Sequence, residues 1–343
     1  MTQLTLNRTP PVRRELDCME PLQFTPILKC RRWGGRKLGD RLGKSLEERQ
    51  DYAESWEICD MGESQSVVQS GPHAGKTLNE LVKESPEELL GSGSEVNQFP
   101  LLMKYLDSHR ASSLQVHPND DQAMRIAGEQ NGKTEAWVIL EAAKDSWLYA
   151  GLKSGINRND FVKALAAGNI TSCLHRIEPK QGEVYYIPAG TIHALGDGIL
   201  VAEIQQSSDL TFRIHDWGWV DENGQPRDLH LKEALECIDF DCGPVEPVSS
   251  GLSPQNNSNQ SEFLIDSPYF QVERFSCPNS RTISEENQCR ILMVLEGACK
   301  IATDATSYRC QTGSTLLLPA SCPDVLIESE TDDGCQILLT RVV

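Results

Sequence analysis

The sequence predicts a mainly β fold, organised as two related β-barrels with a few helices. One observation is that much of the chain consists of short, apolar, β-forming segments bounded by Gly, Pro or Asp. Many short strands with few helices are typical of a β-sandwich or barrel. The other is that two separate parts of the chain resemble each other, which is the pattern of a duplicated barrel.

The internal similarity lies in two blocks of sequence. Residues 182–193 (GEVYYIPAGTIH) align without gaps with residues 313–324 (GSTLLLPASCPD), so that a Gly, a Pro and an Ala coincide. Residues 135–143 (EAWVILEAA) align in the same way with residues 290–298 (RILMVLEGA). The first copy has the longer connection between its blocks. We therefore expect two related barrels, with extra chain inserted into the first.

The extra chain includes one of three helical signals. Residues 157–170 begin at Asn and Asp, carry apolar residues at helical spacing and end near a Gly, so they predict an inserted helix. Residues 76–91 predict an amphipathic helix and a turn, and residues 229–238 predict a third helix. The clearest strand signals are residues 183–190, 199–206, 289–297 and 314–321.

Composition shifts predict the domain boundaries. Residues 1–20 are polar and contain a Pro-Pro pair, so we expect a loosely held tail. Residues 243–261 are rich in Pro, Ser and Asn and are typical of a linker. The expected organisation is therefore a first barrel with helical insertions over residues 21–242, the linker, and a second barrel over residues 262–343.

Charge and cysteine usage exclude several functions. The formal net charge of −18 argues against nucleic acid or an anionic membrane as a partner, since both require a basic face. No apolar run of about 18 residues indicates a membrane span, and the first residues do not resemble a secretory signal. The twelve cysteines are scattered without a C-x-x-C motif, so we expect reduced thiols, no zinc ribbon and a cytoplasmic location.

Four polar residues suggest a metal site. Gln115 and His117 lie in LQVHPND, Glu135 lies in GKTEAW and His193 lies in IPAGTIHALGDG. Because strands alternate, Gln115 and His117 point to the same face, and neighbouring barrel strands can bring the other two close. Two imidazoles, one carboxylate and one amide oxygen suit zinc or another divalent first-row ion. On spacing alone, ordinary polar residues of the core remain the alternative.

The internal alignment assigns this metal site to one barrel. His193 aligns with Asp324, and Glu135 aligns with Arg290. The second copy therefore lacks the two candidate ligands that can be compared. We expect a metal-binding first barrel and a second barrel without metal ligands.

The motifs also resemble a known family. LQVHPND, GKTEAW and YYIPAGTIHALG, followed by TFRIHDWGWVDENGQPRDLHLKEAL, resemble the type I mannose-6-phosphate isomerases of the cupin superfamily, in their shorter bacterial form. PILKCRRWGGRKLG and ESWEI resemble that family's opening segments, so the likeness spans residues 21–343. It implies a double cupin fold and a zinc-dependent enzyme, with one divalent ion per chain, that interconverts mannose 6-phosphate and fructose 6-phosphate through a cis-enediol.

The resemblance also implies roles for individual residues. The family's zinc ligands fall on Gln115, His117, Glu135 and His193. Its active-site arginine falls on Arg213, and the lysine beside the metal-binding glutamate falls on Lys133. Both are expected to be catalytic and to bind substrate. Ser113, which is not carried over from the family, is a further candidate for substrate binding, at the phosphate.

Other positions around these motifs are less well defined. Arg31 and Arg32 are further candidates for a phosphate site, and Trp33 and Trp56 are candidates for the pocket wall or the core. One departure from the family pattern is His215, which stands before Asp216 where an aromatic residue is common. His215 shares a strand face with Arg213 if the segment is extended, and otherwise occupies an outer position.

Several alternatives stay open at this point. The proton acceptor is Lys133, a metal-bound water or another carboxylate. Two histidines and a carboxylate on a cupin also suit a non-haem iron oxygenase, and a sugar-binding module without turnover or an isomerase of unphosphorylated aldoses are further readings. The expected partner is a small phosphosugar, and the expected assembly is a monomer or a homodimer.

Overall fold

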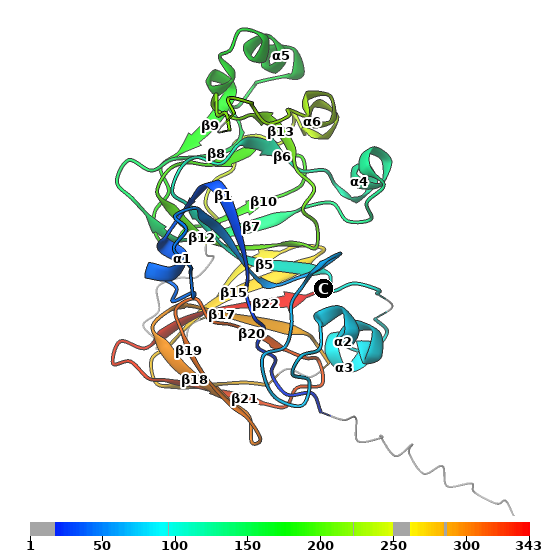
Figure 1. Cartoon of the computed structure of the whole chain (residues 1–343), viewed down its shortest axis with the longest axis vertical. Coiled ribbons are helices and arrows are strands. Elements are labelled where there is room, and N and C mark those ends of the chain that lie inside the picture. Colours follow the sequence, from blue (N-terminus) through cyan, green and yellow to red (C-terminus); the bar gives the residue numbers. More distant parts are fainter. Residues whose placement is uncertain (1–17, 95, 222, 250–260, 285–286) are drawn as a thin grey trace, which may run out of the picture.

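The computed structural model describes residues 18–343 except 95, 222, 250–260 and 285–286. Two β-barrels lie one above the other along the long axis, the first coloured blue to green and the second yellow to red (Figure 1). This arrangement confirms the expected mainly β fold with two barrels.

The first barrel consists of two sheets. The six-stranded sheet has the order β1 (Ile27–Gly35), β2 (Tyr52–Ile58), β5 (Leu101–Ser108), β12 (Ile199–Gln206), β7 (Glu135–Ala142) and β10 (Val184–Ile187). The five-stranded sheet has the order β13 (Phe212–His215), β6 (Leu114–Val116), β11 (His193–Leu195), β8 (Leu148–Leu152) and β9 (Leu174–Ile177). A small hairpin of β3 (Asp60–Met61) and β4 (Ser64–Gln65) follows β2.

The second barrel repeats this design with fewer strands. Its five-stranded sheet has the order β14 (Ser261–Asp266), β15 (Phe270–Cys277), β22 (Cys335–Val342), β17 (Arg290–Glu296) and β20 (Thr315–Leu318). Its four-stranded sheet has the order β16 (Ser280–Ile283), β21 (Val325–Ser329), β18 (Ala298–Ala302) and β19 (Ser307–Gln311).

Strand register confirms the internal alignment. In the first barrel Ile187 of β10 pairs with Glu135 of β7. In the second barrel Leu318 of β20 pairs with Arg290 of β17. These are the residues that the two aligned blocks superimpose, so the copies have the same strand pairing and Arg290 stands where Glu135 stands in the first barrel.

All three predicted helical regions contain helices. Residues 76–91 form α2 (Leu78–Glu84) and α3 (Pro86–Leu90), residues 157–170 form α5 (Arg158–Ala166), and residues 229–238 form α6 (Leu231–Cys237). A 3-10 turn at Ile170–Cys173 follows α5. Helix α5 lies between β8 and β9, whereas residues 303–306 alone join β18 to β19, which confirms that the helical segment is inserted.

Two further helices were not predicted. These are α1 (Lys37–Asp40) and α4 (Asp120–Ala127). Helix α4 has a capping box, in which the Asn119 side chain accepts from the backbone N–H of Gln122 and the Gln122 side chain accepts from that of Asn119. It ends at Gly128 in a left-handed conformation. Only Ala123 of this helix is buried, and Met124 is exposed, so the helix lies largely on the surface.

The central strands bury both faces. Along β12, Leu200, Ala202 and Ile204 belong to the apolar core between the two barrels. The alternate residues Ile199 and Val201 pack inside the first barrel instead. Strand β22 does the same in the second barrel, where Leu338 packs into the shared core and Ile337 and Leu339 pack inside. The first barrel therefore rests on the second through one continuous apolar layer.

The segment before the first barrel contacts the second barrel, and the segment after the first barrel contacts the first. Leu22 forms a β-bridge with Leu317 of β20, and Met19 N–H donates to the Ser321 hydroxyl. Val245 and Val248 donate backbone hydrogen bonds to the first barrel. Residues 1–17 of the expected tail and 250–260 of the expected linker lie outside the described residues, and the domain boundaries stay a prediction.

Two expectations from composition concern membrane-spanning helices and the state of the cysteines. No helix among the described residues is long and apolar enough to cross a membrane. All twelve cysteines fall within the described residues, and each is free.

Replacing Leu338 by Ala tests the shared core. Leu338 is fully buried, so the change removes apolar contacts and leaves a cavity that costs about 2–5 kcal/mol of unfolding free energy. Leu326→Ala is the control, because Leu326 is 37% exposed in the same barrel and a surface change costs about 0.5 kcal/mol or less. Urea unfolding monitored by circular dichroism measures the unfolding free energy of both variants. Equal losses of unfolding free energy would contradict the claim that the apolar layer between the barrels stabilises the fold.

Candidate metal centre and active site

Three neighbouring strands bring the predicted residues together. His193, the first residue of β11, pairs with Gln115 of β6, and Gln115 pairs on its other side with Arg213 of β13. His117 directly follows β6, and Glu135 is the first residue of β7 in the opposite sheet. Residues far apart in the sequence thus meet within the first barrel because of strand register.

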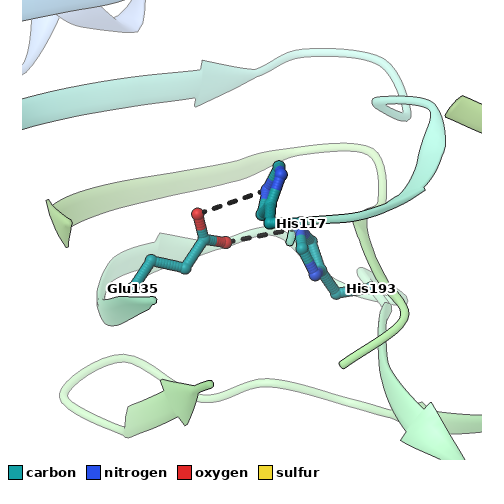
Figure 2. A group of neighbouring side chains, drawn as sticks. All are labelled: His117, Glu135 and His193. Carbon is teal, nitrogen blue, oxygen red and sulfur yellow. Dashed lines mark ion pairs between the residues drawn. The ribbon is translucent and has the colours of Figure 1, made fainter. Parts of the chain in front are cut away.

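His117, Glu135 and His193 form a buried cluster (Figure 2). His117 Nε2 lies 3.5 Å from Glu135 Oε2, and His193 Nε2 lies 3.3 Å from Glu135 Oε1. All three side chains are nearly or fully inaccessible to solvent. The two imidazoles face the carboxylate, so three ligand atoms converge on one point.

Backbone carbonyls fix which imidazole nitrogen faces the carboxylate. His117 Nδ1 donates to the Leu210 carbonyl and His193 Nδ1 donates to the Thr191 carbonyl, both at 2.9 Å. The Nε2 lone pairs therefore point into the cluster. Burial lowers the pKa of His193 to about 4 and that of His117 well below its usual value. Both rings are neutral at pH 7, the state that binds metals.

Glu135 is the least satisfied group of the cluster. Burial raises its pKa to about 7, although the Lys133 ammonium opposes this shift. Neither carboxylate oxygen accepts a hydrogen bond of regular geometry, with Lys133 Nζ 3.1 Å from Oε2. Buried acceptors normally have partners, and a divalent cation between the carboxylate and two neutral imidazoles supplies one. The residues present therefore fit a metal ion.

Gln115 and Lys133 border this cluster. Gln115 Nε2 lies 3.2 Å from His193 Nε2, and its Oε1 lies 3.4 Å from the Ser113 hydroxyl. A half-turn of the amide presents Oε1 to the cluster instead, as a fourth ligand would require. Lys133 Nζ lies 3.1 Å from His117 Nε2, so its positive charge is in direct contact with the site.

A cavity of about 200 Å³ opens beside the cluster. Six residues singled out in the sequence line it, namely Arg31, Trp33, Ser113, Gln115, Lys133 and Arg213. The structure thus places the expected substrate-binding residues in one pocket next to the expected metal ligands. Their individual roles stay predictions.

Three other singled-out residues lie elsewhere. Arg32 pairs with Asp216, and the buried Trp56 packs with Cys59 and Leu102. The register of β13 shifts between Arg213 and His215. The ring centroids of His215 and Trp217 lie 4.9 Å apart, and His215 is not among the residues that line the cavity.

The same cavity contains an ion pair that the sequence analysis missed. Lys104 of β5 and Glu203 of β12 are cross-strand partners, with Nζ 3.2 Å from Oε2, and both are nearly buried. Burial opposes charge on both groups, but each stabilises the other, so the pKa of Glu203 falls to about 2 and that of Lys104 rises. Trp137 Nε1 also donates to Glu203 at 2.9 Å.

A signal for this pair exists in the sequence. Lys104 is the one charged residue before Asp107 in the apolar run LLMKYLDS, and Glu203 is the one charged residue in ILVAEIQQ. A charge at the centre of an apolar strand must be paired if it is buried. The partner of each charge follows only from strand register.

Replacing Glu135 by Gln tests the metal centre. The amide has nearly the same size but no charge, so we expect bound metal after dialysis to fall from about one ion per chain towards zero, because the change removes the only negative charge that the proposed ligands offer to a divalent ion. Glu141→Gln is the control, since Glu141 lies on the same strand and pairs with Lys37 and Arg41. Elemental analysis measures both, and full metal content in the Glu135 variant would contradict the assignment.

Comparisons with known proteins agree with this geometry. Residues 22–141 match the family model of the phosphomannose isomerase type I catalytic domain, and residues 259–332 match that of the mannose-6-phosphate isomerase cupin domain. The chain is 34% identical over 321 residues to the probable mannose-6-phosphate isomerase GmuF of Bacillus subtilis (strain 168), covering 94% of this chain and 99% of the relative. It is 34% identical over 309 residues to mannose-6-phosphate isomerase ManA of the same organism, covering 90% and 96%.

Solved structures show the same likeness. The crystal structure of the mannose 6-phosphate isomerase from Bacillus subtilis has a TM-score of 0.85 and 30% identity, covering 94% of this chain and 99% of the other. The structure of a putative mannosephosphate isomerase from Archaeoglobus fulgidus shares the fold, with a TM-score of 0.74 and 21% identity, covering 96% of this chain and 100% of the other. Because the sequence likeness extends over nearly the whole chain and both family models match, the chain belongs to the type I mannose-6-phosphate isomerase family of enzymes.

Proposed function

We propose that this isomerase uses one zinc ion to interconvert D-mannose 6-phosphate and D-fructose 6-phosphate through a cis-enediol intermediate. The observation that carries the zinc assignment is the buried Glu135 carboxylate, whose oxygens lack regular hydrogen-bond donors and face two neutral imidazoles. Membership of the family supports the substrate and the reaction.

The reaction moves protons without adding or removing atoms. One proton leaves C2 of the aldose while the carbonyl oxygen on C1 gains one, which produces the enediol. The hydroxyl on C2 then loses its proton and C1 gains one, which produces the ketose. The energetic difficulty is the negative charge that develops on the two sugar oxygens when C2 loses its proton.

His117, Glu135 and His193, with Gln115 as the fourth ligand, would hold zinc beside the cavity that Gln115 lines. Zinc, when bound there, supplies a Lewis acid that stabilises the developing negative charge. The Glu135 carboxylate would offset one of the two positive charges of the zinc ion. The site would therefore keep a net positive charge that favours an oxyanion. This charge balance distinguishes the site from a neutral sugar-binding pocket.

Donors of the chain orient the sugar beside this centre. Lys133 lines the cavity in contact with the cluster, and Arg213 lines it one strand beyond Gln115. Their positive charges attract sugar oxygens that become negative, and the Arg213 guanidinium offers a fork of donors. Ser113 adds a hydroxyl on the same wall. Held in this way, the sugar reacts as part of a preorganised complex.

Lys104 and Glu203 line the cavity from the six-stranded sheet. Because its pKa is about 2, Glu203 stays ionised at pH 7 and acts as an acceptor for sugar hydroxyls that enter the cavity. Lys104 and the Trp137 indole hold this carboxylate in place. A fixed acceptor facing fixed donors favours a polyhydroxylated substrate over an apolar one.

Chelation and zinc restoration test the proposed function. We expect fructose 6-phosphate formation from mannose 6-phosphate to vanish on zinc removal and to return when zinc is restored, because the centre stabilises the charge of the transition state. Oxygen uptake that requires iron would instead indicate an oxygenase. A protein that holds zinc but converts neither mannose 6-phosphate nor mannose would contradict the isomerase assignment.

Replacing Arg213 by Ala tests the donor wall. We expect kcat/KM for mannose 6-phosphate to fall about 100-fold, as is common when a preorganised donor is removed, while bound zinc is retained. Arg176→Ala is the matched control, because Arg176 lies on β9 of the same sheet, is largely exposed and pairs with Glu178. Coupled spectrophotometric assays of both variants measure the difference, and equal rates would remove Arg213 from the site.

A further inference from the structure

Three arginines gather at the rim of the cavity around one carboxylate. Asp216, which is 8% exposed, pairs with Arg227 through both of its oxygens, with Nε 2.9 Å from Oδ2. Arg32 pairs with Oδ2 of the same carboxylate. Arg227 and Arg213 line the cavity, whereas Arg32 is not among its lining residues. One negative charge is therefore shared between two guanidinium groups, with a third guanidinium beside them.

The positive charge of this rim is not fully balanced. Arg213 Nη1 donates to the backbone carbonyl of Asp228 at 2.8 Å, and its buried Nε has no hydrogen-bond acceptor among the described residues. The carboxylates of Asp221 and Asp228 are exposed and act through solvent. Burial, and after it the charge of Arg227, lower the pKa of both Arg32 and Arg213. A chain with a net charge of −18 thus carries a local cationic site.

Strand pairing sets the distance between the arginines at the rim and the metal centre. His193, Gln115 and Arg213 form one row across β11, β6 and β13. Two strand spacings separate the ends of this row, roughly 10 Å. A hexose phosphate bears its reacting carbons at one end and its phosphate at the other. With C1 and C2 at the metal end, the phosphate reaches the arginine end.

A tight turn sets the direction of Asp216. Trp217 has φ of +55°, a conformation that is unusual for a bulky residue and stores strain. Its backbone N–H donates to His215 Nδ1 at 3.1 Å, and its indole Nε1 donates to the Ser112 carbonyl at 2.6 Å. The turn is thus locked on both sides. The structural role of the unusual His215 is to accept this hydrogen bond.

We propose that Arg227, held by Asp216, binds the phosphate of the substrate together with Arg213, and that Asp216 is a positioning residue. The proposal rests on the proposed function and names the part of the site that distinguishes a phosphorylated sugar from a free one. A guanidinium fixed by a carboxylate on one edge presents its remaining N–H groups in a set direction, and such forks match phosphate oxygens. Because Arg32 shares the carboxylate, Arg227 keeps positive charge for the ligand.

Kinetics of the zinc-loaded Arg227→Gln variant test the proposal. We expect KM for mannose 6-phosphate to rise about 10- to 100-fold, the loss of one or two charge-assisted hydrogen bonds, with kcat changed less than KM. Conversion of free mannose should stay within about twofold of the wild type. Arg110→Gln is the matched control, because Arg110 is exposed, stacks on Trp219 and does not line the cavity.

Asp216 variants separate positioning from folding. Asp216→Asn keeps the shape but removes the charge that holds Arg227, so KM for mannose 6-phosphate should rise, while Asp216→Glu should recover part of the loss. Thermal unfolding and zinc content report whether either variant is damaged. If Asp216→Asn does not fold, the kinetics of Arg227→Gln still test the proposal.

Binding of inorganic phosphate keeps this test independent of turnover. Calorimetry on the zinc-loaded proteins should show phosphate affinity lowered about tenfold or more in Arg227→Gln and unchanged in Arg110→Gln. An unaltered phosphate affinity, or equal losses of activity on mannose 6-phosphate and mannose, would overturn the proposal. If the wild type converts neither sugar, the proposed function fails, and the calorimetric result still decides whether this rim binds phosphate.

Discussion

A carboxylate buried between two neutral imidazoles constrains the rest of this structure. Glu135 has almost no access to water, and its oxygens lack regular hydrogen-bond donors. Such a group is costly to bury unless a cation accompanies it. Backbone carbonyls at Leu210 and Thr191 orient both imidazoles towards this carboxylate. The cluster is therefore preorganised for a metal ion, and Lys133, which lines the cavity beside it, lies in contact with His117.

The two-barrel architecture explains how the site is held in place. Strand β12 packs one face on the second barrel and turns the other, which carries Glu203, towards the cavity. The second barrel repeats the strand pairing of the first but has Arg290 where the first has Glu135. The first barrel contains the cluster of His117, Glu135 and His193. The second barrel contributes to the apolar layer against which the six-stranded sheet of the first barrel packs. Rigid sheet on both sides limits the movement of the ligands.

Motifs and internal repetition predicted the parts of the site that depend on local pattern. The gapless alignment anticipated the strand register. Strand alternation predicted that Gln115 and His117 share a face, and both lie against the His193 ring. The pairing of Lys104 with Glu203 was missed because it depends on which strands are neighbours. The ion pair between Asp216 and Arg227 was missed because it depends on the left-handed backbone conformation at Trp217. Tertiary register and unusual backbone conformations are properties that periodicity does not report.

The most direct test of the account is a stepwise zinc titration of the metal-free protein, in which isomerase activity and bound zinc are measured on the same samples. If the cluster is the catalytic centre, activity rises linearly with zinc and stops rising at about one equivalent per chain, the capacity of a single closed set of ligands. Full activity without zinc, or activity that rises only after the tight site is filled, would show that this cluster is not where the sugar is isomerised.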